Sequence, residues 1–200
     1  MEPESDLFDD DAERLALERL IQRADGFALA FARVNSLIRR RELAADLRQR
    51  LEANVRVIEV NVPPETTDLE SLLARAYAEA DVDGRKLTFF VYGIERVLSS
   101  ARERTGFLPV LNYKRENLQR AVPAPVVLWM PEFALQLIIR GAPDLWAWRS
   151  GVFEFTSPRE EVERNWQSLE DLGLDVLIKI DPAEATWRGE MGGSGAGWSR

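Results

Sequence analysis

The stretch Leu87-Thr88-Phe89-Phe90-Val91-Tyr92-Gly93-Ile94-Glu95 decides the fold class of this 200-residue chain. Its residues before the glycine are aromatic, aliphatic or β-branched with no polar alternation, which is typical of a strand covered on both faces in a parallel sheet. The run breaks at Gly93, and a carboxylate follows at Glu95. We therefore expect a central buried strand with an acidic side chain just beyond its carboxyl end.

Four further apolar runs predict the neighbouring strands, at residues 26–34, 55–60, 125–130 and 151–155. Helical patterns lie between them, at residues 37–51, 67–80 and 133–140. Between residues 96 and 121 the pattern loosens, and Thr105-Gly106 and Pro109 predict a loop before a short helical piece at 111–118. The alternation of strand and helix predicts an α/β fold, a three-layer sandwich around a mainly parallel five-stranded sheet.

The ends of the chain are expected to flank a single globular domain. Residues 1–24 are predicted to be an acidic lead-in and an N-terminal helix starting near Ala12, with residues 1–11 in solvent, and residues 25–156 to be the α/β domain. Residues 157–182 are predicted to be a C-terminal amphipathic helix and extension, and residues 183–200 a glycine-rich flexible tail. The tail glycines lack the strand and helix that a nucleotide-binding loop requires.

The composition excludes several kinds of site. The chain has no cysteine and no histidine, which removes disulfides, Cys/His zinc sites and histidine-based catalytic triads. A net charge of -8 disfavours nucleic acid as a partner, because such binding depends on neutralising phosphates with Lys and Arg. The N-terminus is acidic and no apolar run is long enough to span a bilayer, so we expect a cytoplasmic protein without a membrane partner. No metal site and no cofactor are predicted.

Several short motifs stand out between about residues 26 and 156. The most specific is Asp144-Leu145-Trp146-Ala147-Trp148-Arg149-Ser150-Gly151-Val152-Phe153-Glu154-Phe155. The others are residues 31–36 with the arginine-rich helix after them, residues 92–95, Leu111-Asn112 with Arg115-Glu116, and residues 127–133. Together these motifs resemble a P-loop NTPase core and, more closely, the degenerate, inactive members of the STAND class of signal-transduction ATPases. The resemblance implies a domain of bacterial signalling and conflict proteins, where such domains commonly precede tetratricopeptide repeats.

The join after the first strand lacks the residues of a working P-loop. A functional loop places G-x-x-x-x-G-K-[ST] between strand and helix, so that backbone N–H groups surround the phosphates and the lysine reaches them. The corresponding residues here are Arg33-Val34-Asn35-Ser36-Leu37, with no glycine and no lysine. Asn35 and Ser36 are therefore candidates for a vestigial ligand site, although a helix-capping role explains Ser36 more simply.

Three consecutive arginines, Arg39, Arg40 and Arg41, follow this join and are candidates for an anion-binding patch. The more ordinary alternative is a solvated cluster that pairs with Glu42, Asp46 and the acidic N-terminus.

Glu95 and Glu132 are the candidate carboxylates. An active relative would carry an acidic pair at the third strand, where this chain has Tyr92 and Gly93. Glu95 has a structural alternative as the ion-pair partner of Arg96 or Arg115. Mg²⁺ needs only one or two protein carboxylates when phosphates complete its shell, so a site with Glu95 and Glu132 as ligands stays open.

Two tryptophans and an arginine are candidates for an interaction surface, because tryptophan and arginine are enriched in binding hot spots. They are Trp146, Trp148 and Arg149, and core packing at the entry to the fifth strand is the default alternative.

Taken together, these residues predict a non-catalytic regulatory or protein-interaction module, acting in bacterial signalling or defence. Its partner would be another protein chain, such as a tetratricopeptide-repeat or effector protein. The alternative is a domain that binds or weakly hydrolyses NTP through Arg39–Arg41. The two hypotheses differ in whether a nucleotide binds, and the sequence does not decide between them. A metal-dependent nuclease is disfavoured because no acid lies two residues before a lysine, and a receiver domain because Tyr92 stands where an aspartate is required.

Overall fold

A computed structural model describes residues 4–81 and 83–156 of the chain. Within these ranges five strands form one sheet: β1 (Ala28–Arg33), β2 (Val55–Asn61), β3 (Lys86–Tyr92), β4 (Pro125–Met130) and β5 (Arg149–Glu154). Every pairing is parallel, and the strand order is β2-β3-β4-β1-β5. The predicted α/β class and five-stranded parallel sheet are therefore confirmed.

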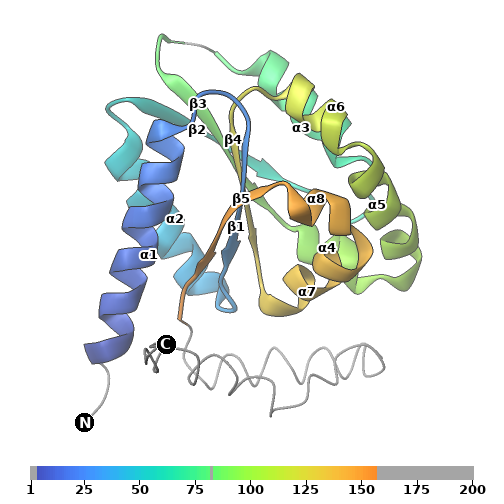
Figure 1. Cartoon of the computed structure of the whole chain (residues 1–200), viewed down its shortest axis with the longest axis horizontal. Coiled ribbons are helices and arrows are strands. Elements are labelled where there is room, and N and C mark those ends of the chain that lie inside the picture. The colour runs from blue at the N-terminus through green and yellow to red at the C-terminus, as the bar shows by residue number, and fades with distance from the viewer. Residues whose placement is uncertain (1–3, 82, 157–200) are drawn as a thin grey trace, which may run out of the picture.

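Helices cover both faces of the sheet (Figure 1). One face carries α1 (Glu4–Arg23) and α2 (Leu37–Leu51). The other carries α3 (Leu69–Glu79), α4 (Ile94–Ser99), α5 (Ala101–Tyr113), α6 (Arg115–Ala121), α7 (Glu132–Gly141) and α8 (Pro143–Ala147). The strand order explains this division. After β1 the chain crosses to the far edge at β2 and then returns through β3 and β4 to β5, so right-handed crossovers place α2 and the later helices on opposite faces.

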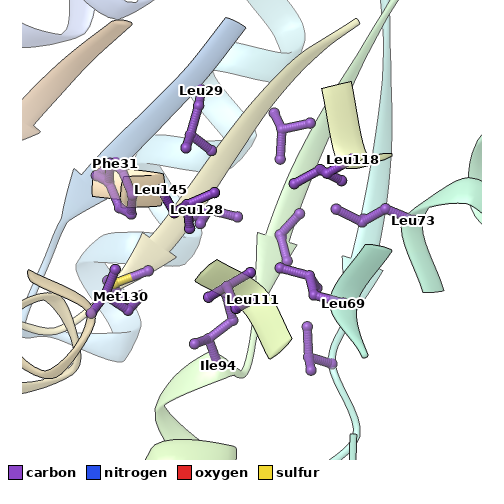
Figure 2. Packing of buried hydrophobic residues seen from close by; sticks show 14 of the residues in the cluster. Leu29, Phe31, Leu69, Leu73, Ile94, Leu111, Leu118, Leu128, Met130 and Leu145 are labelled. Carbon is purple, nitrogen blue, oxygen red and sulfur yellow. The ribbon is translucent and has the colours of Figure 1, made fainter. Parts of the chain in front are cut away.

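The central strands are buried on both sides because their residues alternate between two cores. Phe89 and Val91 of β3 contribute to the core under α3 to α8, whereas Phe90 between them packs under α1 and α2. Figure 2 shows the larger core, in which Leu73 of α3 and Leu118 of α6 lie over the sheet. The apolar run at residues 87–92 was thus correctly predicted to be a strand covered on both faces.

The loop predicted around Thr105-Gly106 and Pro109 was wrong, because that segment is helical. It lies inside α5, which carries both the glycine and the proline. Phe107 and Leu108 are buried in the larger core, and burial of this face favours a helix that local propensity disfavours.

Two further boundaries differ from the prediction. Helix α1 begins at Glu4 rather than Ala12, and Asp10, expected in solvent, is buried. Strand β5 begins at Arg149 rather than Gly151. A short helix, α8, precedes it and starts at Pro143, because proline is well suited to the first turn of a helix. The predicted C-terminal helix and extension at 157–182 and the tail at 183–200 lie outside the described residues. None of the helices described is long and apolar enough to cross a membrane.

Candidate functional site

A cavity of about 450 Å³ lies at the carboxyl ends of the strands. It is lined by the residues after β1 and β4, the start of α2, the end of β2 and the junction of β3 with α4. After β1 the chain crosses the sheet toward β2, whereas after β4 it crosses in the opposite direction, toward β5. In open α/β sheets, ligands bind beyond the carboxyl ends of the strands at the point where the crossing direction reverses. We call this cavity the carboxyl-edge cleft.

The join between β1 and α2 is short, and its side chains cap two helices. Ser36 is the N-cap of α2, with an extended backbone, and its Oγ accepts a hydrogen bond of 3.1 Å from the backbone N–H of Arg39. Asn35 Oδ1 accepts a hydrogen bond of 2.8 Å from the backbone N–H of Glu132, at the start of α7. Both groups therefore satisfy N–H donors that helix starts leave without an intrahelical partner.

Arg40 and Glu95 form an ion pair at the cleft, which joins α2 to α4. The Nη1–Oε1 distance is 2.9 Å, and the two side chains are only 10% and 15% exposed. Arg40 Nη1 also lies 3.5 Å from the carbonyl oxygen of Trp129, and its guanidinium lies 5.8 Å from the centre of the Tyr92 ring. The pair holds opposite charges together in a poorly hydrated place, where removing either partner is costly.

The ion-pair partner predicted for Glu95 was wrong. Arg96 instead donates a hydrogen bond of 3.0 Å to the carbonyl of Val62, and Arg115 lies 3.7 Å from Asp144. The sequence could not indicate Arg40, because the two residues come from helices on opposite faces of the sheet and meet only at its edge.

The three consecutive arginines diverge rather than form one patch. Arg39 contacts Asp10 at 3.0 Å and Glu42 at 3.4 Å, as the prediction of an internally paired cluster would require. Arg40 is buried in its pair with Glu95. Arg41 is exposed, lines the cleft and has no carboxylate partner in the described part of the chain. Only Arg40 and Arg41 therefore reach the cleft.

Glu132 is held by neighbouring side chains. Its Oε2 lies 2.6 Å from Arg33, and its Oε1 accepts a hydrogen bond of 2.7 Å from Gln136. Arg33 also pairs with Glu154 at 2.9 Å. Among residues 4–81 and 83–156, no three potential acidic ligands gather in a way that would hold a metal ion. Both carboxylates proposed as magnesium ligands therefore already have arginine partners.

Tyr92 at the end of β3 lines the cleft as a neutral phenol. Burial raises its pKa well above the ordinary value, and the nearby charge of Glu59 acts in the same direction. A phenol that does not ionise in the physiological range cannot act as a base there, so Tyr92 offers the cleft a ring face and a hydroxyl.

Trp146, Trp148 and Arg149 lie away from the cleft, at the amino end of β5. Arg149 is in register with Leu29, near the amino end of β1. Its guanidinium lies 4.2 Å from the centre of the Trp146 ring, which packs 5.1 Å from Phe31. Trp148 lies instead beside Arg115, at 5.7 Å. The two tryptophans therefore belong to different contacts.

Several cleft residues were missed in the sequence. Asn61 ends β2, Ser99 ends α4, Leu37 begins α2, and Phe133 is the second residue of α7. Asn61 was open to prediction, because it ends a parallel strand and so had to lie at the same edge as Glu95. The apolar residues carried no such signal, since their spacing is that of ordinary core positions.

Comparisons with known proteins give a likeness of fold. No protein-family model matches the chain, and no curated protein sequence matches it. A structure of the Aeropyrum pernix ORC2 protein, in ADPNP–ADP complexes, matches with a TM-score of 0.50 and 15% identity over 80% of this chain and 52% of that one. The Aeropyrum pernix ORC1 protein in complex with DNA matches with a TM-score of 0.44 and 12% identity over 79% and 49%.

Rif2, in complex with the C-terminal domain of Rap1, matches with a TM-score of 0.45 and 12% identity over 86% of this chain and 59% of that one. The chain thus spans about half the length of the ORC structures. Its five-stranded parallel sheet with helices on both faces resembles P-loop NTPase folds of the AAA+ type, and the predicted P-loop-NTPase-like architecture is confirmed.

Proposed function

We propose that this chain is a non-catalytic P-loop-NTPase-like module that acts by binding a partner protein in bacterial signalling or defence. One observation carries the proposal: the join between β1 and α2 is closed by its own side chains. Ser36 caps α2 and Asn35 caps α7, across a join with no glycine and no lysine. A phosphate-binding loop needs a run of free backbone N–H groups in this place.

The charges around the cleft support the same proposal. Glu95 is paired with Arg40, and Glu132 is paired with Arg33. The negative charge of each carboxylate is therefore already compensated by a partly buried arginine. A magnesium ion bound to either carboxylate would lie close to that guanidinium, and the repulsion between the two positive charges disfavours such a site.

The partner is proposed to be a protein, such as a tetratricopeptide-repeat or effector protein, met in the cytoplasm. Trp146 and Arg149 support an interaction surface at the amino end of β5, because Arg149 is exposed and its guanidinium covers the half-buried Trp146 ring. This arrangement presents a planar cation with aromatic surface beneath it, a combination enriched at protein interfaces.

The proposal is tested by the thermal midpoint of the purified protein with and without millimolar ATP, ADP, GTP or GDP and magnesium. A ligand that binds only the folded state must raise the midpoint, and one present at 100 times its Kd stabilises by about 2.7 kcal/mol. We expect no change with any of the four nucleotides. An upward shift would contradict the proposal and favour a nucleotide-binding module.

Nucleotide binding is the second candidate function, because Arg41 and Arg96 line the cleft without a carboxylate partner among the residues described. If a shift appears, Arg41→Ala should abolish it. Arg19→Ala is the matched control, since Arg19 is exposed on α1 and does not line the cleft. A shift that survives Arg41→Ala would exclude Arg41 as a phosphate contact.

A further inference from the structure

The carboxyl-edge cleft is positively charged, although the protein is acidic. Its lining contains three arginines and one carboxylate, and so carries a net charge of +2: Arg40, Arg41, Arg96 and Glu95. The whole chain has a net charge of -8. A larger groove beside β2, of about 850 Å³, is lined by three arginines and three carboxylates and is neutral. The excess of positive charge is therefore a property of the cleft that the groove beside β2 does not share.

Two of the cleft arginines are available to a ligand. Arg41 and Arg96 are exposed, and neither has a carboxylate partner in the described part of the chain. Arg40 is not available, because it is buried and paired with Glu95 at 2.9 Å. Arg96 is held in place by a hydrogen bond of 3.0 Å from its Nη2 to the carbonyl oxygen of Val62. A guanidinium has five N–H donors, so Arg96 keeps further donors for a second acceptor.

Apolar and aromatic surface lies beside these charges. Leu37, the first residue of α2, lines the cleft and is 59% exposed. Tyr92 is half-buried and contributes the ring of a neutral phenol. Asn61 is exposed at the end of β2 and adds an amide that can donate and accept hydrogen bonds. A cavity of about 450 Å³ with apolar walls and a few polar groups is typical of a binding site.

The groups around the cleft favour a carboxylate over a triphosphate. A guanidinium pairs with a carboxylate through two parallel N–H···O bonds and needs no further device. A triphosphate depends in addition on a run of free backbone N–H groups after β1. At this join Ser36 and Asn35 accept hydrogen bonds from two of the N–H groups at helix starts. The cleft therefore suits an acidic side chain with an apolar neighbour.

We propose that the carboxyl-edge cleft binds an acidic segment of the partner protein. A carboxylate of that segment pairs with Arg41 and Arg96, and an adjacent apolar side chain contacts Leu37 and the ring of Tyr92. The inference rests on the proposed function, because it names the chemistry of the partner and the place where it binds. The contact is separate from the surface at Trp146 and Arg149, which lies at the amino end of β5.

NMR titration of the whole ¹⁵N-labelled chain with two synthetic peptides tests the site. The acidic probe is acetyl-Glu-Leu-Glu-Phe-Glu-amide, and the control peptide has Gln in place of each Glu. With the acidic peptide at millimolar concentration, we expect saturable shifts of the side-chain Nε–H signals of Arg41 and Arg96. The glutamine peptide should bind at least about tenfold more weakly, because it cannot form charge-assisted hydrogen bonds.

The backbone amide of Tyr113 is the internal control, since Tyr113 is 81% exposed at the end of α5 and does not line the cleft. Its signal should not move with either peptide. The absence of any shift at Arg41 and Arg96 with the acidic peptide would overturn the proposal. Shifts confined to Arg149 and the indole of Trp146 would place the acidic contact at the amino end of β5 and overturn the cleft as its site.

A matched pair of arginine variants locates the contact. Arg41→Gln removes an exposed charge at the cleft and should weaken binding of the acidic peptide by about tenfold. Arg19→Gln makes the same change at an exposed position on α1, away from the cleft, and should leave the affinity unchanged. Salt at about 1 M should also weaken binding, because it shortens the Debye length to about 3 Å. Equal affinities of the two variants, or an affinity independent of salt, would overturn the proposal.

The outcome can be separated from that of the proposed function. The titrations contain no nucleotide, so a failure of the acidic peptide to bind overturns the acidic-segment site and leaves the non-catalytic function intact. That function fails on a different measurement, a nucleotide-dependent rise in the thermal midpoint.

Discussion

At the scale of single residues, the pair of Arg40 and Glu95 dominates the cleft. Arg40→Met keeps the apolar stem but leaves Glu95 as an uncompensated charge at a site where it is 15% exposed. We expect the free energy of unfolding in urea to fall by about 3–5 kcal/mol, as for other broken buried pairs. Adding Glu95→Gln should restore much of this loss, because it removes the stranded charge.

Arg48→Met is the control for this pair, as the same substitution on the same helix. Arg48 and Glu59 are 58% and 43% exposed and lie 3.8 Å apart, so the loss should be about 0–1 kcal/mol. Equal losses in the free energy of unfolding for Arg40→Met and Arg48→Met would show that the buried Arg40–Glu95 pair stabilises the protein no more than the exposed Arg48–Glu59 pair.

At the scale of elements, two glycines give opposite predictions for one substitution. Gly106 lies in α5 with open space around it, so Gly106→Ala should raise the free energy of unfolding by about 0.5–1 kcal/mol through higher helix propensity. Gly93 is the N-cap residue before α4, at φ +88°, and a Cβ there would lie 2.9 Å from the carbonyl oxygen of Val62.

Gly93→Ala should therefore destabilise the protein, by about 1–2 kcal/mol for the left-handed backbone alone. Urea unfolding of the two variants measures both effects. A stabilising Gly93→Ala would mean that the turn between β3 and α4 readily adopts another backbone conformation, and a destabilising Gly106→Ala would contradict the helix across residues 101–113.

At the scale of the whole molecule, acid should unfold the protein. Arg85 hydrogen-bonds Asp83 and lowers its pKa from 3.8 to about 2. Burial raises the pKa of Asp46 and of Asp68, but hydrogen bonds from Arg50 and Arg14 to the first, and from Lys114 and Ser71 to the second, outweigh burial and leave both values lowered.

Because these carboxyl groups have lower pKa values in the folded state, the unfolded chain binds protons more readily as the pH falls through 3.8. Their stabilisation is present above that pH and is lost as the pH falls through their folded-state pKa values, which for Asp83 is about 2. The thermal midpoint should therefore decrease across this range, and less steeply in Asp83→Asn. A midpoint that rises on acidification would contradict the contribution of these ion pairs.

The sequence by itself determined the sheet and its strand positions, because uninterrupted apolar runs such as residues 87–92 can be satisfied only by burial on both faces. It also determined the cap at Ser36, whose hydrogen bond to Arg39 spans a single helical turn. The lack of glycine and lysine after β1 was likewise visible without coordinates.

Only the tertiary structure decided the contacts that join distant segments. Arg40 meets Glu95, and Asn35 meets the start of α7, because parallel strands bring their carboxyl ends to one edge. Tertiary packing also decided the helix across Gly106 and Pro109. Local helix propensity disfavours it, but the helix buries Phe107 and Leu108 in the core. Local patterns determine which segments form strands and caps, whereas long-range packing decides which charges meet and which side chains line the cleft.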